Sequence, residues 1–171
     1  MTKKVGSNAV FYVFLAAALL WMAFIYMKSA ETYQQQSLRP FLESKLSEQQ
    51  LQHFPHLSFH YDGQWISWQD PINAIEFFIR KAGHVSEYAL LALLWSIAWL
   101  AKPMRLNMAL GTSFLISIVY AATDEWHQTF VKDRTGHPID VAVDAVGILL
   151  AIAIVWLVMR RKTRLTAKRK G

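Results

Sequence analysis

Long apolar runs separated by polar segments dominate the hydropathy pattern of this chain. The runs cover residues 9–27, 82–100, 106–123 and 139–159. An α-helix needs roughly 20 apolar residues to cross a hydrocarbon core about 30 Å thick, and each run is close to that length. We therefore predict an all-α membrane protein, a bundle of four transmembrane helices, with residues 1–171 forming a single membrane domain.

The first apolar run could also be the core of a cleaved signal peptide. Cleavage after Ala30 would place Lys28 at a position of the cleavage motif that requires a small side chain. Trp21 and Tyr26 lie toward the far end of the run, where the aromatic belt of a membrane helix is expected. We therefore interpret this run as an uncleaved first transmembrane helix.

The longest polar region, residues 28–80, separates the first two apolar runs. Residues 29–52 are rich in Gln, Ser and Glu with periodic Leu and Phe, which predicts one or two short surface helices. In SFHYDGQWISW, residues 58–68, an Asp-Gly pair between alternating apolar residues predicts a β-hairpin. Because a lone two-stranded hairpin is marginally stable in water, we expect it to lean on the helices or to place its Trp side chains in the membrane interface. Residues 72–81 form an amphipathic lead-in to the second membrane helix.

Composition agrees with a membrane protein, because 54% of the chain is hydrophobic. The absence of Cys excludes disulfides, thiolate catalysis and Cys-based zinc sites. The net charge is +6, and residues 160–170 form a basic tail without acidic residues. Such a tail can attract nucleic acid, but directly after an apolar run it is more typical of the cytoplasmic flank of a membrane helix. We expect no nucleic-acid partner.

The distribution of Lys and Arg predicts the orientation of the bundle. The short turn at residues 102–105 is basic and free of acidic residues, as is the C-terminal tail. Basic residues near membrane ends favour the cytoplasmic side. The prediction is a multi-pass cell-membrane protein with both termini in the cytoplasm and residues 28–80 outside.

Polar residues gather at the ends of three predicted helices that this orientation places at the outer face. Lys81, His84 and Tyr88 fall on one face of the second helix, and Asp140 and Asp144 on one face of the fourth. Ionisable residues at such a depth are costly and are candidates for a functional site. We predict that one polar cavity is shared by these ligand-binding candidates: Lys81, His84, Tyr88, Asp124, Glu125, Gln128, Arg134, Asp140 and Asp144.

The same residues allow other interpretations. Carboxylates favour the positive end of a helix dipole, so the cluster could be a structural ion-pair network. His84 with Glu87 or Asp124 could form a catalytic acid–base pair, although no nucleophile motif accompanies them. His and carboxylate side chains also suit zinc or manganese, but no dense metal-ligand motif is present, and we expect neither a metal nor a cofactor.

Two stretches resemble the VanZ-like family of small bacterial membrane proteins: KAGHVSEYALLALL at 81–94 and ATDEWHQTFVKDRTGHPIDVAVDAVG at 122–147. The family pattern is K-x-x-H-x-x-x-Y, then D-E-x-x-Q, then R-x-x-x-x-x-D-x-x-x-N with a following Gly. In this chain the pattern falls on Lys81, His84, Tyr88, Asp124, Glu125, Gln128, Arg134, Asp140 and Gly147. Asp144 stands where the family often has Asn, which adds a negative charge to the predicted cavity.

This resemblance covers residues 76–160 and implies a contribution to low-level resistance to the glycopeptide teicoplanin. Because glycopeptides act outside the membrane, we expect the cavity to bind membrane lipid, or a lipid-linked, cell-wall or lipoglycopeptide ligand. The alternative is an interfacial hydrolase or transferase acting on such a substrate through His84 and nearby carboxylates. A transporter is less favoured, because the inner halves of the predicted helices carry no polar path. A purely structural scaffold is the remaining alternative.

Overall fold

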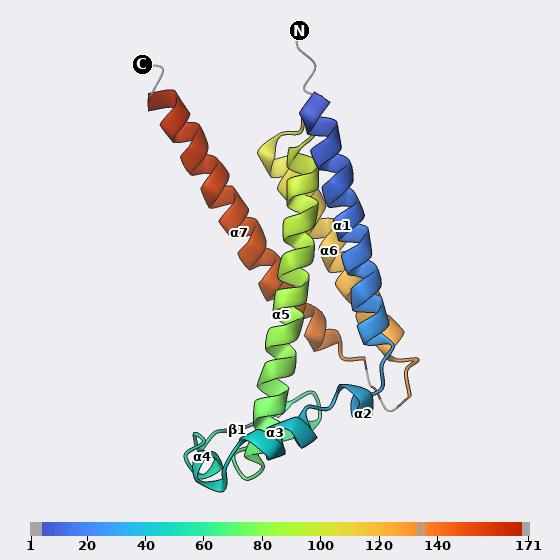
Figure 1. The fold of residues 1–171 in the computed structure, drawn as a ribbon, viewed down its shortest axis with the longest axis vertical. Coiled ribbons are helices and arrows are strands. Elements are labelled where there is room, and N and C mark those ends of the chain that lie inside the picture. The colour runs from blue at the N-terminus through green and yellow to red at the C-terminus, as the bar shows by residue number, and fades with distance from the viewer. Residues whose placement is uncertain (1–4, 133, 135, 169–171) are drawn as a thin grey trace.

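Four long helices form the body of the protein, and a group of short elements covers one end of them (Figure 1). The computed structural model describes residues 5–132, 134 and 136–168. The long helices are α1 (Val5–Ser29), α5 (Pro71–Leu100), α6 (Leu106–Gln128) and α7 (Pro138–Lys168). The start of α1 and the end of α7 lie at the same end of the bundle, and α7 diverges from the other helices toward that end.

Three of these helices are long and apolar enough to cross a membrane, by length and composition. Their apolar parts are Asn8–Ser29, Leu106–Gln128 and Pro138–Thr166. The predicted span at residues 82–100 lies within α5, whose first half is much more polar than the other helices. The structure therefore supports a membrane protein with three membrane-length apolar helices, whereas the sequence predicted four.

Helix α5 is the central element, because it packs against α1, α6 and α7. It contains 30 residues. At 1.5 Å per residue it is roughly 45 Å long, which exceeds the hydrocarbon thickness of about 30 Å. Asp70 caps its first turn by accepting a hydrogen bond from the Asn73 amide, and Pro71 occupies the first helical position, where its missing N–H has no cost. The predicted lead-in at residues 72–81 is thus continuous with the apolar part of the helix.

The polar segment between α1 and α5 folds into the predicted hairpin and into three short helices, where the sequence predicted one or two. They are α2 (Tyr33–Gln36), α3 (Arg39–Lys45), α4 (Glu48–Gln52), β1 (Ser58–Tyr61) and β2 (Gln64–Ser67). Asp62 and Gly63 both have positive φ, of 45° and 79°, as the tight Asp-Gly turn of a hairpin requires. The Phe59 ring contacts Phe77 and Phe78 of α5, so the hairpin leans on that helix.

Helices α5 and α7 approach most closely at Gly147. A Cβ atom on Gly147 would overlap the carbonyl group of Val85 and lie 3.1 Å from the backbone nitrogen of Ala89. Glycine permits this approach because it has no side chain between the two backbones. The contact also brings Asp144, one turn earlier on α7, against the part of α5 that carries His84.

We expect Gly147→Ala to lower the stability of the folded bundle by about 1–3 kcal/mol, because the added methyl group overpacks a backbone contact. Gly111→Ala in α6 is the matched control, since a Cβ there meets no atom within 4 Å. The control should be neutral or slightly stabilising, because Ala favours the helix more than Gly does. Thermal unfolding of both variants in the same detergent tests this, and equal midpoints would contradict the close packing at Gly147.

Candidate functional site

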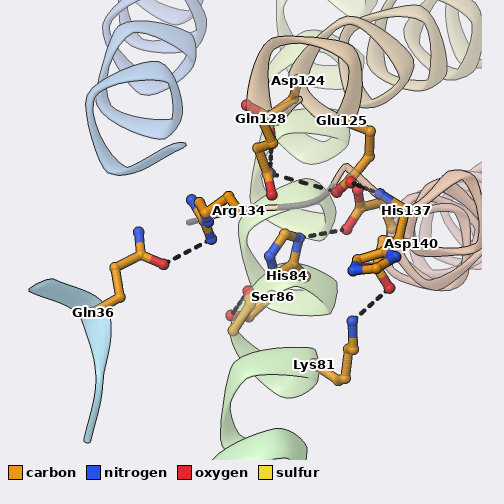
Figure 2. Close-up of polar contacts among 12 residues, drawn as sticks. Gln36, Lys81, His84, Ser86, Asp124, Glu125, Gln128, Arg134, His137 and Asp140 are labelled. Carbon is orange, nitrogen blue, oxygen red and sulfur yellow. Dashed lines mark hydrogen bonds and ion pairs between the residues drawn. The ribbon is translucent and has the colours of Figure 1, made fainter. Parts of the chain in front are cut away.

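The predicted site residues lie where α5, α6 and α7 meet, at the end of the bundle covered by the short elements. Figure 2 shows His84 of α5, Glu125 of α6 and Asp140 of α7 reaching toward a common space. Helix α6 extends beyond the predicted end at residue 123 and continues to Gln128. This extra turn places Asp124 and Glu125 on a helix, with their side chains buried inside the bundle.

His84 and Asp144 form the deepest polar pair of the site. His84 Nδ1 lies 3.2 Å from Asp144 Oδ1. Asp144 is completely buried, and its second oxygen has no hydrogen-bond partner among the described residues. The close approach at Gly147 makes this pair possible, because it brings the two helices within side-chain reach. The sequence analysis predicted Glu87 or Asp124 as the acidic partner of His84, whereas in the structure His84 pairs with Asp144.

Glu125 is held in a fixed orientation by two donors. The backbone amide of His137 donates to Glu125 Oε2 over 3.0 Å, and Gln128 Nε2 lies 3.5 Å from Glu125 Oε1. The same Gln128 nitrogen donates to Asp124 Oδ2 over 3.2 Å. Because Gln128 follows these acids by one helical turn, a single amide serves both buried carboxylates.

Asp140 belongs to a second polar group, next to the hairpin. Lys81 Nζ lies 2.5 Å from Asp140 Oδ1, and the Tyr61 hydroxyl donates to the same oxygen. The Lys81 ammonium also sits over the Tyr61 ring, 4.5 Å from its centroid. Burial raises the pKa of Tyr61, and its hydrogen bond to Asp140 raises it further, so the phenol stays protonated and remains a donor.

Arg134, which the sequence predicted to lie among the acidic residues, binds the end of α1 instead. Its Nη1 donates to the carbonyl oxygens of Ser29 and Glu31 over 3.0 and 3.4 Å, and its Nη2 donates to Gln36 Oε1 over 2.8 Å. These acceptors include a carbonyl of the last α1 turn, where a helix lacks internal donors. Within the described part of the chain, Arg134 forms no ion pair with Asp140 or Asp144, which pair with Lys81 and His84 instead.

A second guanidinium group lies close to Arg134. Arg80 stacks over the Tyr33 ring at 4.6 Å and forms no ion pair within the described part of the chain. Burial lowers the pKa of Arg134, and the nearby positive charge of Arg80 lowers it further. Two neighbouring guanidinium groups create a positive centre.

Two adjoining cavities meet at this positive centre. One has a volume of about 100 Å³ and opens between α5, the hairpin and the α6–α7 loop. The other, of about 230 Å³, lies between α1, α5 and α6. Both cavities are lined by the same four residues: Arg80, His84, Gln128 and Arg134.

The remaining candidates are arranged around these cavities. Asp124 and Glu87 line the larger one. Tyr88 lines neither; it is fully buried in the core of the bundle, beside Asp124 and Asp144. The nine predicted ligand-binding residues thus divide into a deep group around His84, a Lys81–Asp140 pair, and Arg134, which binds the end of α1.

Sequence reasoning missed four residues that the structure places at the site. Tyr61 comes from the hairpin and Gln36 from the short helix α2, and neither carries a periodic signal that points to the bundle. Arg80 precedes Lys81 on α5 and looked like part of a polar lead-in. Glu76 is buried and accepts a hydrogen bond from the Leu38 amide over 2.8 Å. Its position within the amphipathic lead-in at residues 72–81 was the sequence signal that could have identified Glu76.

Comparison with protein families gives one match. The family described as VanZ/LLP1 matches residues 14–159, which is most of the chain. This range extends well before the predicted start at residue 76, so the family unit includes α1 and the polar segment as well as the helices that carry the motifs. Neither a curated protein nor a solved structure matches the chain.

Proposed function

The chain belongs to the VanZ/LLP1 family, and we propose that it is a multi-pass cell-membrane protein that binds the anionic head group of an amphiphile. The binding site would be formed by the two cavities that share Arg80, His84, Gln128 and Arg134. The neighbouring pair of guanidinium groups is the observation that carries this proposal.

The proposed topology has four spans with both termini in the cytoplasm. The apolar C-terminal part of α5 is surrounded by α1, α6 and α7, so it crosses the membrane together with them. Lys102 and Arg105 then lie on the same side as the basic tail, in agreement with the preference of such residues for the cytoplasm. This topology puts the short elements and both cavities on the outer side.

Burial and the repulsion from Arg80 both lower the pKa of Arg134, and an anionic group between the two guanidinium groups would relieve that repulsion. Guanidinium groups bind phosphate and carboxylate through paired, charge-assisted hydrogen bonds. Arg80 is well suited for this, because its interaction within the described chain is with the Tyr33 ring rather than with an acid. The site therefore offers charge and donors to an incoming anion.

The larger cavity also fits the rest of an amphiphile. Ile25 and Ile79 give it an apolar wall between α1 and α5, next to the positive residues. Glu87 and Asp124 line another wall and can accept hydrogen bonds from hydroxyl or amine groups. A lipid-linked sugar phosphate has a matching group for each part of this cavity. Its phosphate matches the positive residues, its lipid chain the apolar wall, and its hydroxyl groups the acidic wall.

We expect Arg80→Gln to weaken binding of a polyprenyl phosphate by about 10- to 100-fold, since a hydrogen bond to a charged group is worth about 1.5–3 kcal/mol. The full chain would be purified in a neutral detergent, and its binding of polyprenyl phosphate compared with that of the uncharged polyprenol. Arg39→Gln is the matched control, because Arg39 is exposed and pairs with Glu43 and Asp70 away from the cavities.

Equal binding of the phosphate and the alcohol, or unchanged binding by Arg80→Gln, would contradict the proposed site. The same variants report on teicoplanin resistance in cells. If resistance depends on this site, Arg80→Gln should lower the inhibitory concentration of teicoplanin to that of cells without the protein, and Arg39→Gln should not.

An interfacial hydrolase or transferase is the second candidate, favoured by the His84–Asp144 pair. A carboxylate on Nδ1 orients the imidazole and leaves Nε2 for proton transfer, as in catalytic histidines. Because His84 lines both cavities, a substrate bound there would meet the ring. Release of phosphate or alcohol from a bound lipid-linked pyrophosphate would support an enzyme, and a bound lipid recovered unchanged would support the binding function.

A further inference from the structure

Three side chains of the types that bind metal ions converge in the deep part of the site, from three different helices. His84, Glu125 and Asp144 each offer a ligand atom, and these atoms all lie within 4.8 Å of one another. Four ligands about 2.1 Å from a tetrahedral zinc ion lie roughly 3.4 Å apart. The 3.2 Å separation between His84 Nδ1 and Asp144 Oδ1 has this spacing.

The charge of this group is not balanced by the described residues. Asp144 is completely buried, and its Oδ2 atom has no hydrogen-bond partner among them. Glu125 is also buried, so one imidazole faces two carboxylates. A buried carboxylate is stable only when it is paired, hydrogen-bonded or bound to a metal.

The nearby basic side chains are engaged elsewhere. Lys81 pairs with Asp140, which lies one turn away from Asp144 on α7. Arg134 donates to the end of α1 and to Gln36. The group around Asp144 therefore has room for a positive charge from outside the chain.

We propose that His84, Glu125 and Asp144 form a binding site for a divalent transition-metal ion. One imidazole and two carboxylates suit zinc or manganese. The orientation of Glu125 by Gln128 and by the His137 amide resembles the outer-shell support that metal ligands usually have. This inference departs from the expectation of no metal, which rested on the absence of a local motif; the ligands are instead distributed over three helices.

The role of Asp144 becomes specific in this arrangement. A carboxylate is a stronger ligand for a divalent cation than the neutral amide of an Asn side chain. Metal binding by this chain should therefore depend on Asp144. The three ligands do not include Arg80 or Arg134, the guanidinium groups of the anion site, although His84 lines both cavities.

The test uses the full chain without a polyhistidine tag, purified in detergent, treated with a chelator and dialysed. Titration with zinc or manganese should show one bound ion per chain, by calorimetry and by elemental analysis. His84→Gln and Asp144→Asn should each weaken that binding at least tenfold, in line with the losses seen when metal-site groups are removed. No lipid is added, so failure here leaves the anion site untouched.

Two controls make the test specific. Glu76→Gln changes another buried carboxylate, whose partner is the Leu38 amide, and should keep the metal. A variant in which His53, His56 and His60 are replaced, all in the polar segment away from the cluster, should also keep the metal.

If the His84 and Asp144 variants fail to fold, X-ray absorption of the zinc-loaded wild-type protein still identifies the metal ligands. One imidazole with oxygen ligands supports the site; several imidazoles, no stoichiometric binding, or unchanged affinity in both variants overturns it.

Discussion

Replacing Lys81 with Met is expected to lower the free energy of unfolding by about 3–5 kcal/mol, the usual cost of removing one partner of a buried ion pair. Lys81 Nζ lies 2.5 Å from Asp140 Oδ1, and the two side chains are only 21% and 9% exposed. Without the ammonium group, Asp140 keeps the Tyr61 hydroxyl as a donor but loses its positive partner. Thermal unfolding in detergent measures the loss.

The pair of Lys28 and Glu31 provides a matched control. Its N–O distance is also 2.5 Å, but its side chains are 42% and 37% exposed. Because exposed pairs contribute about 0–1 kcal/mol, Lys28→Met should have little effect. Burial, rather than the distance between the charges, would then account for the difference between the two Lys variants.

Asp140→Asn combined with Lys81→Met should recover part of the stability, because it removes the buried charge that the single variant leaves unpaired. The Asn side chain still offers an oxygen to the Tyr61 hydroxyl. A double variant that is less stable than Lys81→Met would show that Asp140 contributes through contacts other than this ion pair.

The fold could be predicted largely from the sequence, because its main elements follow from local patterns. Apolar runs indicated the long helices, and the Asp62-Gly63 pair indicated the hairpin that the structure contains. The residues at which the helices begin and end were less predictable. Helix α6 continues five residues past its predicted end at residue 123, because Asp124, Glu125 and Gln128 are buried inside the bundle, and buried polar side chains leave no apolar signal.

The site could be predicted as a group of residues but not as a set of pairs. Helical spacing placed Asp140 and Asp144 on one face of α7, and Lys81 and His84 on one face of α5. Which acid meets His84 depends on the depth at which α5 and α7 cross, and that is set by the backbone contact at Gly147. A conformational fact of this kind requires the structure.

The separation of buried charges into groups follows from the same crossing. Lys81 reaches Asp140, while His84 lies one turn farther along α5 and meets Asp144. Lys81 therefore compensates Asp140, the acid nearer to the polar segment, whereas the deeper Asp144 is paired with an imidazole. The proposed anion site and the proposed metal site are therefore adjacent: both use His84, whereas Arg80 and Arg134 belong to the anion site alone.

Arg134→Gln is expected to lower the free energy of unfolding by about 3 kcal/mol, because hydrogen bonds from a charged donor are worth about 1.5–3 kcal/mol each. The Arg134 guanidinium joins the α6–α7 loop to the carbonyl oxygens of Ser29 and Glu31 and to Gln36. Its loss leaves the buried Ser29 carbonyl without this donor. The measurement is again thermal unfolding in detergent.

Arg134→Lys separates geometry from charge. A Lys ammonium is a point charge on a flexible stem, and it cannot span acceptors that the planar guanidinium reaches with two different nitrogens. We expect Arg134→Lys to remain almost as unstable as Arg134→Gln, but to bind polyprenyl phosphate more tightly than Arg134→Gln does, because it keeps the positive charge.

Arg80→Gln should show the opposite pattern, with weak binding and nearly unchanged stability, because Arg80 contacts an aromatic ring rather than a helix end. If Arg134→Lys is as stable as the wild-type protein, the guanidinium does not tie α1 to the loop, and its place at the cavities is explained by its charge alone.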